Sequence, residues 1–250
     1  MSGVTIKSKR EIELMRDAGK LLADVHNRLG EAIAPGISTL DIDRLGEELI
    51  RKSGSIPSFL NYEGYPASVC VSINDEVVHG IPKADRIIKE GDIVSLDIGL
   101  IHNGYQSDAA RTHAVGQVSE EALALIKVTE ESFFEGIKYA KAGGHLYDIS
   151  NAIGNYCISR GYGVVRDLVG HGIGQEMHEP PQIPNFPQKR KGILLCAGMT
   201  LAIEPMINIG RADVDFSDDG WTVTTSDGTL SSHYENTILI TDGEPEILSL

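Results

Sequence analysis

Apolar residues recur every three or four positions along four stretches of the chain, and this spacing predicts four helices. The first begins at Ser8-Lys-Arg-Glu11, a capping-box pattern. Thr39 is the predicted N-cap of the second helix and Ser119 that of the third. Glycine follows each stretch and ends it. The predicted helices cover residues 8–33, 39–54, 119–141 and 146–159.

Alternating apolar and polar positions, rich in β-branched residues, predict strands after each helix pair. The longest such stretch, residues 91–115, is predicted to form a β-hairpin, because Asn103-Gly104 is the commonest two-residue hairpin turn. Asp227-Gly228 predicts a second hairpin turn by the same rule. The other predicted strands cover residues 68–74, 77–79, 163–168, 199–209, 221–225 and 230–240.

The two halves of the chain repeat at a constant offset of 107 positions (204 minus 97). The matched landmarks are Gly36 and Gly143, Asp41 and Asp148, Gly54 and Gly161, Gly91 and Gly198, and Asp97 and Glu204. Several spaced matches at one offset indicate a duplicated unit of two helices followed by strands. We therefore expect an α+β fold with pseudo-twofold symmetry, in which residues 1–250 form one domain with halves at about 8–115 and 119–248.

Composition narrows the class of protein. The 250 residues are 41% hydrophobic, as in ordinary globular proteins, and the formal charge of −14 argues against a broad nucleic-acid or membrane-surface partner. Three cysteines without CxxC spacing fit reduced thiols in the cytoplasm. The first residues lack the apolar core of a signal peptide, and no stretch has the length of a membrane span.

Two carboxylates lie in the predicted hairpin. With a turn at residues 103–104, Asp97 opposes Ala110 and Gly99 opposes Asp108. Because alternate residues share a face, Asp97 and Asp108 are diagonal neighbours on one face. Facing carboxylates in an apolar strand pair repel each other unless a cation lies between them. The alternative is one solvated face of an antiparallel sheet.

Other acids and histidines share this kind of context. Glu204 and Glu235 lie beside apolar strand-like runs, and His79, His171 and His178 lie beside glycine or proline. Singly, each acid is more often a surface residue at a strand end, and each histidine a turn residue. Together, four carboxylates and one imidazole suit two divalent first-row ions such as manganese, iron or cobalt. The remaining candidates without such context, expected to be surface or packing residues, are His102, His145 and His233.

These residues lie in the motifs VVHGIP, LDIG, SDAART, GHGIG, HEPP, AIEPM and YENT. From about residue 6 to residue 248 the chain resembles the type 1 methionine aminopeptidases. The resemblance implies the duplicated pita-bread fold, which agrees with the repeat. It also implies that Asp97 binds one metal ion, that Asp108 and Glu235 bridge two ions, and that His171 and Glu204 bind the other.

The same resemblance implies the catalytic roles. Glu204 would transfer protons for a hydroxide that bridges the metals, His79 would contact the scissile amide nitrogen, and His178 would bind the scissile carbonyl oxygen. The methionine side chain would lie against Phe59, Tyr62, Tyr65, Cys70 and Trp221. Many relatives have cysteine at position 59 and phenylalanine at position 177, so the resemblance leaves the metal site intact but does not determine the shape of the pocket at Phe59 and Met177. Structural sodium or potassium binds some relatives at the positions of Asn74 and Ser231.

The expected function is removal of the initiator methionine from deformylated nascent proteins whose second residue is small and uncharged. The protein's own start, Met1-Ser2, fits that rule. A monomer in the cytoplasm is expected, with association with the ribosome left open. Two alternatives remain on the same fold: an Xaa-Pro peptidase or related hydrolase, and a non-catalytic binding protein.

Overall fold

A computed structural model describes residues 3–250, so Met1-Ser2 lies outside the described residues. It contains four α-helices and one short 3-10 helix. They are α1 (Lys9–Ala32), α2 (Thr39–Lys52), α3 (Glu120–Ile137), α4 (Leu146–Ile158) and η1 (Tyr62–Gly64). Within residues 3–250 no helix is both long and apolar enough to cross a membrane. All three cysteines are free.

The largest sheet has nine strands in the order β1-β4-β5-β14-β9-β7-β8, with β2 also paired to β4 and β15 to β14. Every pairing between its strands is antiparallel. The strands are β1 (Ile56–Pro57), β2 (Val69–Ile73), β4 (Ile93–His102), β5 (Tyr105–Ala114), β7 (Gly170–Gly172), β8 (Glu179–Ile183), β9 (Thr200–Ile203), β14 (Glu235–Leu239) and β15 (Glu246–Ile247).

Two three-stranded sheets lie beside the large one. The first has the order β13-β10-β6, and the second β11-β12-β3. Their strands are β3 (Glu76–Val78), β6 (Gly163–Val164), β10 (Met206–Asn208), β11 (Val214–Phe216), β12 (Val223–Thr225) and β13 (Ser231–His233). Antiparallel sheets flanked by helices confirm the predicted fold class.

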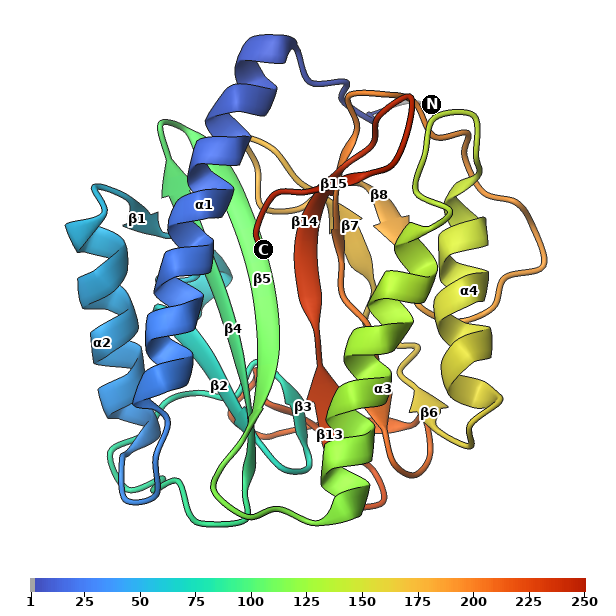
Figure 1. The fold of residues 1–250 in the computed structure, drawn as a ribbon. Helices are drawn as coiled ribbons and strands as arrows, with labels where there is room; N and C mark the ends of the chain where they lie inside the picture. Colours follow the sequence, from blue (N-terminus) through green and yellow to red (C-terminus); the bar gives the residue numbers. More distant parts are fainter. Residues whose placement is uncertain (1–2) are drawn as a thin grey trace.

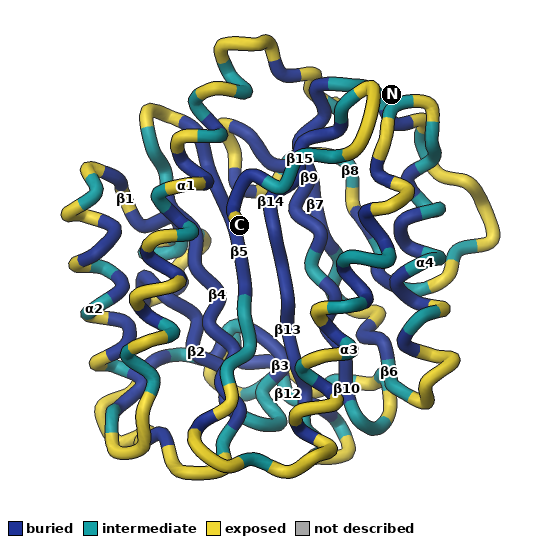
Figure 2. Tube along the Cα trace, in the orientation of Figure 1, coloured by how far each residue is buried: buried dark blue, intermediate teal, exposed yellow. Residues whose placement is uncertain are grey.

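The four helices cover one face of the sheets, with α1 and α2 over the first half and α3 and α4 over the second (Figure 1). In α1, Met15, Leu22 and Leu29 are fully buried, as the predicted apolar stripe requires. The central strands are buried along most of their length, while each helix is exposed on its outer side (Figure 2). Because the helices cover one face of the central strands, the opposite face is where a functional site can form.

The internal repeat is visible in the backbone. In both halves an aspartate accepts a hydrogen bond from the N-cap backbone N–H at 3.3 Å: Asp41 from Ser38, and Asp148 from His145. Three glycine pairs offset by 107 positions share positive φ: Gly36 with Gly143, Gly54 with Gly161, and Gly91 with Gly198. The predicted cap of α2 is wrong by one residue, because Ser38 rather than Thr39 precedes the helix and its hydroxyl accepts from Asp41 N.

Four strand predictions need correction. The predicted strand 230–240 is two strands in different sheets, β13 and β14. Residues 199–209 form two strands in different sheets, because Pro205 has no N–H to continue the ladder after Glu204. The stretch 163–168 is a strand only over Gly163–Val164. Asp227-Gly228 does not connect a hairpin, because β12 pairs with β11 and β3 while β13 pairs with β10.

Candidate functional site

Three carboxylates project from one face of the central strands. On β4 and β5, Asp97 pairs with Ala110 and Gly99 with Asp108, which confirms the predicted hairpin register. On the other side of β5, Ala110 pairs with Glu235 of β14. Paired residues point to the same face, as do residues two apart on one strand, so Asp97, Asp108 and Glu235 surround the small side chain of Ala110.

The second half of the chain adds Glu204, where β9 ends, and His171 on β7. His171 Nε2 lies 3.7 Å from a Glu204 oxygen and 3.8 Å from an Asp108 oxygen. Its Nδ1 lies 2.9 Å from the carbonyl oxygen of Gly172 and therefore carries the proton. This hydrogen bond leaves the Nε2 lone pair directed at the acids, as is usual for a histidine that binds a metal.

The acidic cluster is unfavourable without a cation. Burial raises the pKa of Asp97 to about 7, and burial together with mutual repulsion raises the pKa values of Asp108, Glu204 and Glu235 well above the usual range. One carboxylate oxygen in each of Asp97, Asp108 and Glu235 is buried without a hydrogen-bond partner. Burial lowers the pKa of His171 to about 4, so its imidazole is neutral at pH 7.

These observations fit a metal centre. One ligand atom each from Asp108, His171 and Glu235 lies within 4.8 Å of the others, which is close enough for a single ion to bind all three. Orphaned carboxylate oxygens beside a neutral imidazole form a donor set for divalent cations.

A cavity of about 150 Å³ opens above the acids. The five residues predicted to line a methionine pocket all border it, namely Phe59, Tyr62, Tyr65, Cys70 and Trp221. Trp221 packs edge-on against Tyr65, with 5.2 Å between ring centroids, and the Tyr65 hydroxyl donates to the Gly80 carbonyl at 2.9 Å. Burial raises the pKa of the Cys70 thiol, which therefore stays protonated. The cavity is consequently an apolar, aromatic recess that ends at the acidic cluster.

Two further histidines flank the cavity, as the motifs predicted. His79 has a φ of +58°, an uncommon backbone conformation for this residue type, and its ring centroid lies 6.3 Å from that of Trp221. His178 Nδ1 lies 2.8 Å from the Tyr62 hydroxyl, and its ring stacks edge-on against His171. Burial lowers the pKa of His79 to about 4 and also lowers that of His178, so both are neutral at pH 7.

Sequence reasoning missed His233. The sequence predicts a surface or packing residue at this position, and His233 is indeed buried. What the prediction lacks is the contact with the acids: His233 Nε2 lies 3.8 Å from a Glu204 oxygen and 3.9 Å from a Glu235 oxygen. Its spacing of two residues from Glu235 in an extended segment is the signal that could have found it. Glu63 and Met177 also border the cavity. His102, by contrast, hydrogen-bonds Ser55 at 3.0 Å and lines no part of the cavity.

Asn74 and Ser231, the positions of the implied sodium or potassium site, lie next to each other. The backbone N–H of Ser231 donates to the Asn74 carbonyl at 2.8 Å.

Comparison with known proteins agrees with this geometry. Residues 13–242 match the model of metallopeptidase family M24. A methionine aminopeptidase from Clostridium acetobutylicum is 55% identical, over 99% of each chain. The crystal structure of methionine aminopeptidase from Rickettsia prowazekii is 40% identical, with a TM-score of 0.97 over 99% of this chain and 100% of that one.

A Xaa-Pro dipeptidase from Bacillus anthracis has the same fold at a greater distance. It is 26% identical with a TM-score of 0.80, and the match covers 98% of this chain but 61% of the dipeptidase. The chain therefore belongs to metallopeptidase family M24 and, within it, to the methionine aminopeptidases. The Xaa-Pro alternative is not favoured, since similarity to those enzymes is lower.

Proposed function

We propose that this chain is a metal-dependent aminopeptidase that hydrolyses the first peptide bond of new proteins. It would release the initiator methionine when the second residue is small and uncharged. The observation that carries the proposal is the meeting of three buried carboxylates, the partly buried Glu204 and a neutral imidazole at the end of a recess of about 150 Å³. This cavity is smaller than the pockets of about 300 Å³ or more that bind drug-sized ligands, and it suits one side chain at a polypeptide end.

The donor set indicates which residues would hold the metal. Two divalent ions would be bound by Asp97, Asp108, His171, Glu204 and Glu235, and this mainly oxygen set suits cobalt, manganese or iron(II). Divalent ions there supply Lewis-acid chemistry, which polarises a carbonyl group and acidifies water.

Side chains of this chain would carry out the proton transfer and would hydrogen-bond the peptide group. Glu204, whose pKa burial raises, would take a proton from the attacking water and pass it to the leaving amine. His178, held by Tyr62, would donate to the scissile carbonyl oxygen as negative charge develops, and His79 would contact the amide nitrogen. Both histidines are neutral at pH 7 and can donate one hydrogen bond each without introducing charge.

The aromatic wall would receive the methionine side chain, because flat rings and a thiol suit an unbranched thioether. The substrates would be deformylated nascent polypeptides in the cytoplasm, and the ribosome is a further expected contact. We also propose that the whole chain acts as one catalytic domain and that Asn74 and Ser231 supply backbone oxygens to a structural sodium or potassium ion.

Release of methionine from Met-Ala-Ser peptide tests the proposal. Chelator-stripped protein is supplied with manganese, iron(II), cobalt or zinc, and wild type is compared with His79→Ala and with His102→Ala as the matched control. We expect metal-dependent release that falls about 100-fold or more in His79→Ala, while metal binding and the control stay unchanged. Faster cleavage of Ala-Pro peptide would favour the Xaa-Pro alternative, and no release with any metal would favour a binding protein.

A further inference from the structure

The two halves of the chain meet in the large sheet at the junction of β5 and β14. Within the described part of the chain the backbone ladder between these strands has only two residue pairs, Ala110 with Glu235 and Ala109 with Asn236. The Thr237 hydroxyl of β14 adds a side-chain link, because it accepts from the Asp108 N–H at 3.0 Å and donates to the Asp108 carbonyl at 2.9 Å. Asp97 and Asp108 lie on the first-half side of this junction, and Glu235 lies on the second-half side. The spacing between the acids of the two halves therefore depends on a short ladder.

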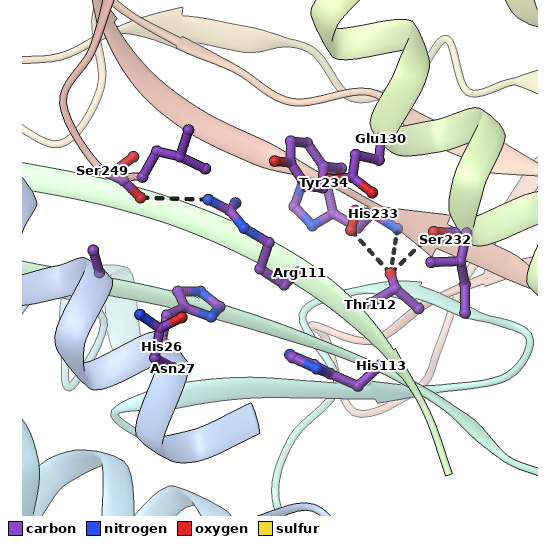
Figure 3. A pocket seen from close by; sticks show the side chains of 13 residues that line it. His26, Asn27, Arg111, Thr112, His113, Glu130, Ser232, His233, Tyr234 and Ser249 are labelled. Carbon is purple, nitrogen blue, oxygen red and sulfur yellow. Dashed lines mark hydrogen bonds between the residues drawn. The ribbon is translucent and has the colours of Figure 1, made fainter. Parts of the chain in front are cut away.

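Arg111 bridges this junction from the opposite face. Because it follows Ala110 on β5, its side chain points to the helical side of the sheet (Figure 3). Its guanidinium donates to the carbonyl of Ala110 at 2.7 Å, to the carbonyl of Glu235, and to Oδ1 of Asn236 at 2.6 Å. A fourth hydrogen bond of 3.3 Å reaches the Ser249 carbonyl (Figure 3). The planar guanidinium of Arg111 thus connects β5, β14 and the penultimate residue Ser249.

Ion pairing does not account for this placement. Arg111 and Glu130 both line a cavity of about 220 Å³ (Figure 3). None of the ion pairs within residues 3–250 includes Arg111. The guanidinium instead lies over the ring of Tyr234, 4.4 Å from its centroid. Its hydrogen bonds to the two strands therefore account for its position.

We propose that Arg111 is a positioning residue that holds β14 against β5 and thereby sets the spacing of the metal-binding carboxylates across the junction. Its bond to the Glu235 carbonyl acts on the backbone of the carboxylate that lies on the second-half side. The part of this inference that concerns metal rests on the proposed function, whereas the part that concerns the strand junction does not.

Hydrogen exchange of the metal-free protein tests the junction. Arg111→Met keeps the apolar stem and removes every donor, Arg111→Lys keeps the charge without the fork, and Arg28→Met, an exposed arginine of α1, is the matched control. We expect backbone exchange in residues 234–239 to become about tenfold faster or more in both Arg111 variants. In the Arg111 variants, exchange in β2 should stay at the wild-type rate. In Arg28→Met, both the exchange rates and the midpoint of urea unfolding should stay at wild-type values.

Titration of the same proteins with manganese by calorimetry tests whether loss of Arg111 weakens metal binding. We expect affinity to fall about tenfold or more in Arg111→Met and by less in Arg111→Lys, with no change in the control. Exchange that is unchanged, or that rises uniformly over the sheet, would overturn the inference, as would full recovery by Arg111→Lys, which would show that charge alone matters. If Arg111→Met does not fold, Arg111→Lys decides by the same criteria. Wild-type protein that binds no manganese would contradict the proposed function, while the exchange data would still decide the role of Arg111.

Discussion

Replacing Asp97 by asparagine tests the electrostatic argument for the metal centre in the metal-free protein. The Asp97 carboxylate is buried and one oxygen has no partner, so burial raises its pKa from 3.8 to about 7. Asparagine has nearly the same shape and no charge at any pH. The substitution therefore removes the ionisation and changes the packing little.

The sign follows from linkage. Below its unfolded pKa, a carboxyl group whose pKa is raised in the folded state is protonated in both states and does not oppose folding. As pH rises through the folded pKa, this stability is lost, because the unfolded state gives up its proton first. One pKa unit corresponds to about 1.4 kcal/mol. Relative to the neutral amide, Asp97 therefore lowers the free energy of unfolding by about 2 kcal/mol at pH 5 and about 4 kcal/mol at pH 8.

Urea unfolding followed by circular dichroism, in the presence of a chelator, measures this difference. We expect Asp97→Asn to be more stable than wild type at both pH values, with the larger gain at pH 8, while exposed Asp24→Asn changes little. Added manganese should reverse the order, because wild type alone keeps the full ligand set. A variant that is no more stable than wild type at pH 8, or a gain that does not grow with pH, would refute the reasoning.

Two glycines make further predictions. A Cβ at Gly99 would lie 2.9 Å from a Phe59 ring carbon and 3.0 Å from the Met177 methyl. Gly99→Ala should therefore raise KM for Met-Ala-Ser several-fold while manganese affinity stays unchanged. An unchanged KM would show that Gly99 does not shape the pocket. A Cβ at Gly19 would lie 2.0 Å from the Leu248 carbonyl oxygen. Gly19→Ala should therefore lower the free energy of unfolding, measured with urea, by about 2 kcal/mol. A decrease below about 0.5 kcal/mol would contradict that packing.

Local interactions account for the predictions that were confirmed. The turn at Asn103-Gly104 uses positive φ at both positions, 50° and 83°, and with strict alternation it determines the register of β4 and β5. The same register places Asp97 and Asp108 on one face. The capping box at Ser8 and Glu11 is likewise set by neighbours three residues apart.

Predictions that required a choice among distant partners were less accurate. Asp227-Gly228 has the same turn chemistry, yet its flanking strands pair elsewhere, because residues 231–233 pair with β10 instead. The only sequence signal for His233 is its spacing of two residues from Glu235, and the fold alone brings it within 4 Å of Glu204 as well. Turn propensity and residue type do not say which of several strands offers a better pairing.

The sequence by itself determined the helices, the central hairpin, the internal repeat and the motifs that carry the family resemblance, because these depend on neighbouring residues or on spacing along the chain. Only the tertiary structure decided how the halves meet: that Glu235 aligns with Ala110, that His171 directs Nε2 at the acids, and that Arg111 bridges the strands from behind. Those contacts join residues up to 125 positions apart, and they exist only once the sheet has closed between the halves.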